Sequence, residues 1–321
     1  MPSLTLPLVI LGGRDRRGSE LPEEGHDKHP IHGYKAVDLR IGGRPLISLL
    51  LERLRACGCF DPILLAGPER VYRPVCPDLP MVDTDGSFGQ NIRAAFEALE
   101  GISHVGHVAF TTCDVLPEPK ELRALLADFE THRDLDFWMP QIRVPRGPEA
   151  LGESGWKPRY RLVPEGETEA VDSLPGHLIV VDPKAVRSNL LFRLFDLSYQ
   201  TRNRPVAYRR AVIARHVMLN LVLADLRLLA RLELPTATWD IVLNGLAIAR
   251  GLRAGTMTAE ELAHRVRKVY IRRSHRRRHP ERKGRMPVLA GLSLAKDVDT
   301  EEEARELAQR LSTDPGPEEN P

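Results

Sequence analysis

The chain has 321 residues, of which 42% are hydrophobic and 28% charged, and its formal net charge is +2. This length allows one large domain or two of ordinary size, and the near-neutral total argues against a dedicated nucleic-acid-binding protein or a strongly acidic one. The charge is unevenly distributed, however, because residues 267–285 contain ten Lys or Arg and one acid, a local charge of +9. The rest of the chain therefore carries −7.

The amino terminus and the cysteines predict a cytoplasmic protein. Residues 1–13 lack the cationic start, long apolar stretch and small-residue cleavage site of a secretory signal. The most apolar region, 211–232, is interrupted by charged and polar side chains, so we expect no transmembrane segment. The four cysteines show no paired C-x-x-C spacing, which favours reduced thiols over a disulfide scaffold or a structural zinc site.

The first 140 residues alternate between strand and helix patterns. Short apolar runs predict strands at Leu6–Leu11, 62–66, 105–111 and 135–140. Amphipathic stripes predict helices from Leu46 to Gly58, from the capping-box sequence 87–90 through 99, and over 119–129. Such alternation predicts a mostly parallel sheet covered by helices, with its ligand crevice beyond the carboxyl ends of the strands.

The second half of the chain is mainly helical. Residues 145–176 are rich in Gly, Pro and Glu and predict an irregular excursion before a strand at 177–181. Helical patterns then cover 206–232, 239–252 and the residues after Thr258, and a last capping signal at Thr300 predicts a helix to about 311. We therefore expect an α/β domain formed by 1–182 and 288–311, a helical insertion over 183–287 with a basic loop at 267–285, and a disordered tail over 312–321.

A glycine-rich segment, Leu11, Gly12, Gly13 and Arg14, followed by Arg17, comes directly after the first predicted strand. Glycines let backbone N–H groups approach phosphate oxygens, and arginines neutralise those oxygens. An ordinary glycine turn explains the pattern equally well, and the segment is neither a P-loop nor the dinucleotide G-x-G-x-x-G.

With the segments that follow, this loop resembles the MobA-like nucleotidyltransferase family, whose pattern runs GGxGxR, then K-A/P-L, then GxPLI before a helix. Here the corresponding segments are 12–17, 35–37 and 42–47. Residues 110–117 resemble the strand-end aspartate segment of that family, 86–95 lie where it places a base-recognition loop and helix, and 297–302 resemble its late D-x-D-T-P-E-D element. The resemblance covers about 1–182 and 288–311. It implies a Rossmann-like, three-layer α/β fold of the nucleotide-diphospho-sugar transferase type (GT-A-like), with a mostly parallel sheet and a helical insertion.

The resemblance also implies a function. A nucleoside monophosphate would pass from an NTP to a phosphorylated small-molecule or lipid-phosphate acceptor, with release of pyrophosphate and with Mg²⁺ as cofactor. Asp114 and Asp299 would bind the metal, since Mg²⁺ prefers one or two protein carboxylates together with phosphate oxygens. The implied catalytic residues are Arg17, Lys35 and Asp114, and the implied nucleotide-binding residues are Leu11, Gly12, Gly13, Arg14, Gly86, Gly89 and Asn91.

Two residues depart from the family pattern. Asp15 stands in place of the third loop glycine, where its charge would weaken phosphate binding unless it faces away or pairs with an arginine. Glu301 replaces a proline, which the first turn of a helix tolerates.

Most of these residues also have ordinary structural interpretations. Asp114 fits a turn and Lys35 an exposed loop, and acids at 297 and 299 suit the start of a helix. Ser87 and Gln90 are expected to cap a helix rather than to contact a base.

Two other functions remain open at this stage. The sequences at 83–85 and 297–299 both have the D-x-D form that GT-A-type glycosyltransferases use to bind metal and nucleotide sugar. A non-catalytic regulator could instead bind nucleic acid through 267–285, a segment that also fits anionic lipid headgroups, a polyanionic substrate or a solvated loop. The sequence leaves the base, the acceptor and the oligomeric state open.

Overall fold

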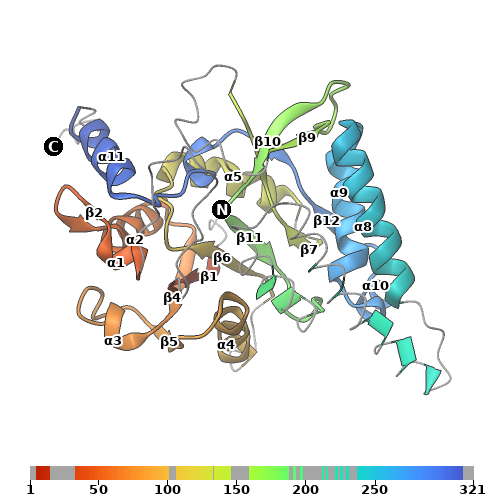
Figure 1. Cartoon of the computed structure of the whole chain (residues 1–321), viewed down its shortest axis with the longest axis horizontal. Helices are drawn as coiled ribbons and strands as arrows, with labels where there is room; N and C mark the ends of the chain where they lie inside the picture. The colour runs from red at the N-terminus through yellow and green to blue at the C-terminus, as the bar shows by residue number, and fades with distance from the viewer. Residues whose placement is uncertain are drawn as a thin grey trace.

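The computed structural model describes residues 5–14, 33–100, 106–132, 134–145, 159–187 and 237–313, with short pieces between 191 and 230. Its main element is a seven-stranded sheet in the order β12-β7-β11-β6-β1-β4-β5 (Figure 1). These strands are β1 (Leu6–Leu11), β4 (Phe60–Gly67), β5 (Met81–Asp83), β6 (Val108–Thr112), β7 (Leu135–Trp138), β11 (Leu178–Val181) and β12 (Lys283–Arg285). Only β11, among these described strands, runs antiparallel to its neighbours. The predicted α/β class with a mostly parallel sheet is confirmed.

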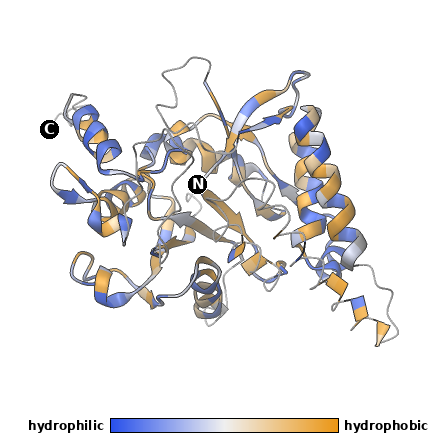
Figure 2. Cartoon of the chain, in the orientation of Figure 1, coloured by the Kyte–Doolittle hydropathy of each residue, from blue (hydrophilic) through white to orange (hydrophobic). Residues whose placement is uncertain are grey.

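Helices cover both faces of this sheet. Along β1, Leu8 and Ile10 join one apolar core, and Val9 and Leu11 join another, because successive side chains of a strand point to opposite faces. The first core contains α2 (Leu46–Cys57) and α5 (Pro119–Thr131), and the second contains α4 (Phe88–Glu100) and α9 (Ala259–Tyr270). The helix α11 (Glu301–Thr313) is largely hydrophilic and borders the first core (Figure 2). The result is the expected three-layer arrangement.

Three helices begin at the capping sequences that the sequence predicts. At the start of α4, Ser87 N–H donates to Gln90 Oε1 over 2.7 Å, and Gln90 N–H donates to Ser87 Oγ over 3.3 Å. The Thr258 side chain caps α9, and Thr300 and Glu303 exchange a reciprocal pair of bonds at the start of α11. Such bonds satisfy N–H groups that have no partner within the helix.

A second sheet occupies part of the segment that the sequence predicts to be irregular. Its order is β13-β8-β10-β9, formed by Val288–Leu289, Gln141–Arg143, Val171–Pro175 and Tyr160–Leu162. The prediction for 145–176 is therefore wrong over β9 and β10, while 146–158 lie outside the described residues. The strands hold two to five residues each, too few to display a period of two against a Gly- and Pro-rich background.

The basic segment 267–285 is not a loop. It contains the end of α9, the helix α10 (Arg273–Arg278) and β12, which pairs in parallel with β7 of the main sheet. Local charge counting predicts repulsion along this run, but several of its arginines pair with carboxylates from distant parts of the chain, on β7, after β11, and on α5 and α8 (Ala237–Ala254). The prediction fails because ion pairs of long sequence separation do not show in a local charge pattern.

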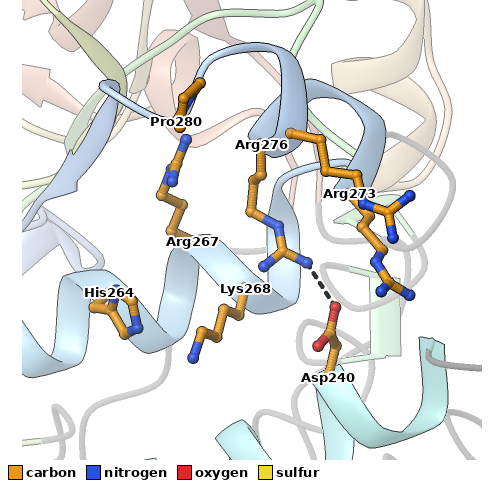
Figure 3. Close-up of a pocket in the computed structure, with 8 residues that line it drawn as sticks. Asp240, His264, Arg267, Lys268, Arg273, Arg276 and Pro280 are labelled. Carbon is orange, nitrogen blue, oxygen red and sulfur yellow. Dashed lines mark hydrogen bonds and ion pairs between the residues drawn. The ribbon is translucent and has the colours of Figure 1, made fainter.

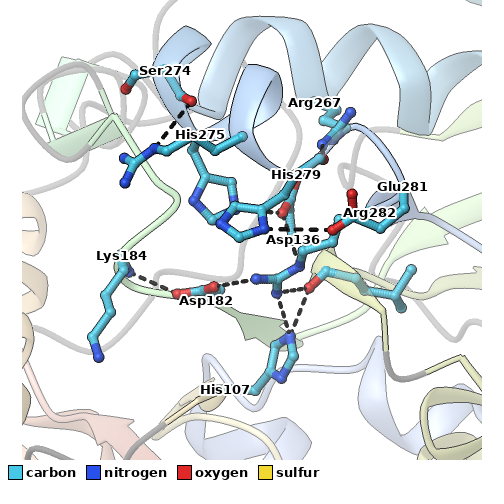
Figure 4. Close-up of polar contacts among 12 residues, drawn as sticks. His107, Asp136, Asp182, Lys184, Arg267, Ser274, His275, His279, Glu281 and Arg282 are labelled. Carbon is cyan, nitrogen blue, oxygen red and sulfur yellow. Dashed lines mark hydrogen bonds and ion pairs between the residues drawn. The ribbon is translucent and has the colours of Figure 1, made fainter.

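The central carboxylate for this segment belongs to Asp136 on β7, which is fully buried (Figure 4). Its oxygens lie 2.5 Å from Arg267 Nε, 3.0 Å from His275 Nε2 and 3.3 Å from Arg282 Nε. Arg282 also pairs with Asp182 over 2.7 Å. A buried carboxylate needs such partners, since an unpaired charge in the interior is strongly destabilising.

The structure also describes part of the predicted insertion and of the carboxyl-terminal segment. The helix α8 packs beside α9. The helix α11 ends at Thr313, so the predicted tail 312–321 is wrong at its first two residues, which are helical, and the rest of it lies outside the described residues. Most of the predicted helix at 206–232 also lies outside them. The division into domains stays a prediction, although β12 connects the end of the insertion to the main sheet.

The remaining expectations concern membranes and thiols. No helix among the described residues combines the length and the apolar character that a membrane span requires. All four cysteines are unpaired. Burial, together with the neighbouring Asp114, raises the pKa of the Cys113 thiol to about 12, so this thiol stays protonated at neutral pH.

Replacing Asp136 tests the ion-pair arrangement. We expect Asp136→Asn to lower the free energy of unfolding by about 3 kcal/mol, because buried guanidinium groups lose their counter-charge. Urea denaturation measures the change. The exposed pair of Glu261 with Arg265 provides the control, and Glu261→Gln should cost less than about 1 kcal/mol. Equal effects of the two substitutions would contradict a structural role for Asp136.

Candidate active site

Several segments meet beyond the carboxyl edge of the central strands. Leu11 at the end of β1 pairs with Ala66 on β4 and with Thr112 on β6, so these three strands end at the same level. The glycine loop follows β1, the turn at Asp114 follows β6, and the 84–91 segment follows β5. This is the edge at which open α/β sheets bind ligands, as the sequence predicts.

Three carboxylates cluster at this edge. Asp114, Asp297 and Asp299 each place an oxygen within 4.8 Å of the others. The late segment reaches Asp114 because Val298 N–H donates to the Asp114 carbonyl over 2.7 Å, and Val115 forms an antiparallel bridge with Asp297. The structure thus brings Asp114 and Asp299 together, as predicted. The structure also adds Asp297 to the cluster, a residue that the predicted metal ligands do not include. Asp297 and Asp299 are two residues apart, and in an extended segment this spacing places their side chains on the same face.

Lys35 lies against this cluster. It begins the short helix α1 (Lys35–Asp38), and its Nζ is 2.5 Å from Asp299 Oδ1. Burial disfavours the ammonium group, but the carboxylates of Asp299, Asp114 and Asp297 outweigh burial and raise the pKa of Lys35. Lys35 therefore carries a positive charge at neutral pH, beside the three acids. The sequence names both Lys35 and Asp299, but their contact spans 264 positions and no sequence pattern shows it.

The cluster fits a hard divalent cation. Asp114 Oδ1 is buried and has no hydrogen-bond partner, which is unusual for a carboxylate oxygen. Within the part of the chain that the structure describes, one ammonium group faces three carboxylates, so negative charge is in excess there. An all-oxygen donor set of carboxylates is the type that Mg²⁺ binds, with water or phosphate oxygens completing its shell.

The glycine loop is narrow. Gly12 N–H donates to the Ala66 carbonyl over 2.8 Å, and a Cβ at Gly12 would lie 2.9 Å from the ring of the fully buried Tyr72. A Cβ at Gly13 would lie 3.0 Å from Asn91 Nδ2. Tyr72, which no sequence motif indicates, therefore forms the floor of the loop. Leu11 is buried at the end of β1, between Ala66 and Thr112, and nucleotide contact by Leu11 stays a prediction.

Arg14 is held at the rim of the loop. Its Nε lies 3.7 Å from Asp85 Oδ1, and its guanidinium carbon is 5.8 Å from the centre of the Tyr34 ring. Tyr34 Oη in turn donates to Asp85 over 3.2 Å. Arg17, the other predicted loop arginine, lies outside the described residues, and so does Asp15.

The 84–91 segment is tied to its surroundings by internal bonds. Asn91 is buried, and its Oδ1 accepts hydrogen bonds from Gly86 N–H and from Thr84 Oγ1, each over 3.0 Å. Gly89 N–H donates to Asp196 Oδ1 over 2.7 Å. Asn91 thus supports the turn beside the glycine loop, and the helical segment containing Asp196 covers Gly89. Nucleotide contact by Gly86, Gly89 and Asn91 stays a prediction.

The two D-x-D sequences have different surroundings. In the first, Asp83 Oδ1 accepts a bond from Glu69 N–H at the start of α3 (Glu69–Tyr72), and Asp85 pairs with Arg70 over 2.8 Å. Neither is part of the carboxylate cluster, which among the described residues consists of Asp114 with the second sequence, 297–299. The interpretation of 83–85 as a metal site is therefore unsupported by the structure.

Residues 33–229 match the model of the MobA-like NTP transferase domain. The chain belongs to this family. The match covers more than half of the chain. It starts after the glycine loop and extends into the predicted helical insertion. The resemblance based on the sequence motifs covers different residues, 1–182 and 288–311. Membership places the protein among nucleotidyltransferases.

Three solved structures are similar to this chain to different degrees. A hypothetical transferase from Thermus thermophilus is 19% identical with a TM-score of 0.53, over 94% of this chain and 100% of that one. CMP:2-keto-3-deoxy-manno-octonic acid synthetase with CTP is 12% identical (TM-score 0.49, 97% and 99% covered). The 4-diphosphocytidyl-2C-methyl-D-erythritol synthase from Anaerococcus prevotii is 10% identical (TM-score 0.43, 96% and 99% covered). The first likeness shows a shared fold. Comparison with curated proteins found no match.

The close approach of Gly12 to Tyr72 gives a test of the loop. We expect Gly12→Ala to lower the free energy of unfolding by about 1–3 kcal/mol, because the added methyl group must displace a packed ring. The control is Gly245→Ala in α8, where a Cβ meets no atom within 4 Å and where alanine should stabilise the helix by up to about 1 kcal/mol. An unchanged unfolding midpoint for Gly12→Ala in urea would contradict this packing.

Proposed function

We propose that the protein transfers a nucleoside monophosphate from a nucleoside triphosphate to a phosphorylated acceptor, with release of pyrophosphate. The observation that carries the proposal is the meeting of Asp114, Asp297, Asp299 and Lys35 at the carboxyl edge of the sheet. Membership in the MobA-like NTP transferase family supports the nucleotide as substrate. The acceptor is a phosphorylated small molecule or a lipid phosphate.

The three carboxylates would hold Mg²⁺. The buried Asp114 Oδ1 without a hydrogen-bond partner and the excess of negative charge are the features that support this assignment. When bound, the cation supplies positive charge close to the triphosphate and the acceptor phosphate.

Lys35 and the loop arginines provide the remaining positive charge. In the reaction, an oxygen of the acceptor phosphate forms a bond to the α-phosphorus while the bond from that phosphorus to the pyrophosphate oxygen breaks. The acceptor phosphate is already ionised at neutral pH, so its attack needs no protein base. Lys35, Arg14 and Arg17 would offset the negative charge of the phosphates, and the glycine loop would fix their position.

The glycosyltransferase alternative has less support. Its argument rests on two D-x-D sequences, but Asp83 caps α3 and Asp85 pairs with Arg14 and Arg70. The remaining sequence, 297–299, suits either reaction. The family match to NTP transferases then favours nucleotidyl transfer.

Single substitutions in the cluster test the proposal. The assay combines the purified protein with Mg²⁺, each of the four NTPs and a panel of sugar phosphates and lipid phosphates, and measures pyrophosphate. We expect Asp114→Asn, Asp297→Asn and Asp299→Asn each to lower kcat/KM by about 100-fold or more, because each removes a charge from the site that organises the phosphates.

Asp83→Asn is the matched control. Asparagine can still accept the bond from Glu69 N–H, so we expect kcat/KM within about threefold of wild type. Pyrophosphate release that is absent with every NTP and acceptor, or equal in wild type and Asp114→Asn, would overturn the proposed function. Tighter calorimetric binding of a nucleotide sugar than of any NTP would favour the glycosyltransferase instead.

A further inference from the structure

A cavity open to solvent lies between α8, α9 and α10 (Figure 3). Its volume is about 600 Å³. Five cationic side chains line it, against one carboxylate, that of Asp240: they are Arg267, Lys268, Arg273, Arg276 and Arg277. None of these residues belongs to the candidate active site. All five cations come from the basic run 267–285, for which the proposed function has no use.

The single carboxylate is shared. Asp240 lies 2.6 Å from Arg276 Nη2 and 3.6 Å from Arg187 Nη2, so one negative charge serves two guanidinium groups. Arg276 Nε is buried and has no hydrogen-bond partner. Lys268 and Arg277 make no ion pair within the described part of the chain. Arg267 pairs with Asp136, and Arg276 with Asp240, so the excess positive charge in the cavity wall is that of Lys268 and Arg277.

The titration of nearby groups is consistent with this excess. Burial and the neighbouring cations, Lys268 first among them, lower the pKa of His264, which also lines the cavity. Burial and the charge of Arg276 lower the pKa of Arg187. In both cases positive neighbours disfavour a further positive charge.

We propose that this cavity binds a small anion carrying two or more phosphate groups. Guanidinium groups bind phosphate oxygens in bidentate fashion, and the cavity wall presents cations around a space larger than one phosphate needs. No aromatic side chain is among its described lining residues apart from the imidazole of His264, so the stacking platform typical of single-stranded nucleic acid is missing here. A compact polyphosphate fits this chemistry better than a nucleic-acid strand.

Calorimetry with inorganic tripolyphosphate tests the site. The full-length protein is titrated in EDTA at constant ionic strength, so that metal-dependent binding at the carboxylate cluster does not contribute. We expect Lys268→Gln/Arg277→Gln to weaken binding by about tenfold or more, because two charge-assisted phosphate contacts are lost. These residues are chosen because their removal breaks no ion pair within the described structure.

Two controls distinguish binding in this cavity from binding elsewhere on the protein. Arg250→Gln/Arg253→Gln removes the same charge from exposed positions of α8 outside the cavity and should leave the affinity within about twofold. Arg14→Gln changes the glycine loop and should also leave the affinity for tripolyphosphate unchanged. Circular dichroism checks that each variant keeps its helix content.

Several results would overturn the proposal. One is an equal affinity of wild type and Lys268→Gln/Arg277→Gln for tripolyphosphate. Another is an equal loss of this affinity in Arg250→Gln/Arg253→Gln, and a third is a loss of this affinity in Arg14→Gln. Tighter binding of a 20-nucleotide single-stranded RNA than of tripolyphosphate, at the same ionic strength, would identify the cavity as part of a nucleic-acid surface instead.

Discussion

Ion pairing between segments that are far apart in the chain determines the arrangement of this protein. At the carboxyl edge of the sheet, Lys35 meets Asp299 from the other end of the chain. At the β12 edge, Asp136 gathers Arg267, His275 and Arg282 from the basic run. Each charge is largely buried, and a buried charge is tolerated when a partner of opposite sign lies in contact. The same requirement that brings Lys35 and Asp299 together also attaches α9, α10 and β12 to the sheet.

The two edges differ in how completely charge is matched. At the β12 edge, Asp136 and Asp182 offset Arg267 and Arg282, and the surplus lies farther out, in the cavity beside Asp240. At the carboxyl edge, three acids face one lysine, so the surplus is negative. The net charge is negative at one of these places and positive at the other, so the two places suit ligands of opposite charge. A cation suits the carboxyl edge, and a phosphate-bearing anion suits the cavity.

The sequence predicts those features whose signals are local. The apolar run Leu6–Leu11, the capping residues Ser87, Thr258 and Thr300, and the αL glycine at Gly58 all produce the elements expected of them. Motif order also places Asp114 beside Asp299, because the resemblance supplies a fold in which the late segment returns. The short strands β9 and β10 escape prediction, since three to five residues carry too little periodicity.

Features that depend on distant partners could not be predicted in this way. Nothing around the basic run indicates that Asp136, more than 130 residues earlier, would order it. Likewise, Tyr72 under Gly12 and Asp85 beside Arg14 are contacts of the folded chain. Asp297 is the exception, because its spacing from Asp299 is visible in the sequence and the extended backbone makes both available to Asp114.

The bond between Asp299 N–H and Glu303 Oε2, 2.7 Å long, ties the carboxylate cluster to the first turn of α11. During synthesis the chain emerges from its amino terminus, so Asp114 is made 185 residues before Asp299, and Lys35 and the glycine loop are made earlier still. Until synthesis reaches Asp299, the segment 297–299, which contacts both Lys35 and Asp114, is incomplete. The cluster can therefore be complete only after Asp299 has been made, and a ribosome-bound chain that stops short of this segment would have the strands of the sheet without the complete acidic cluster.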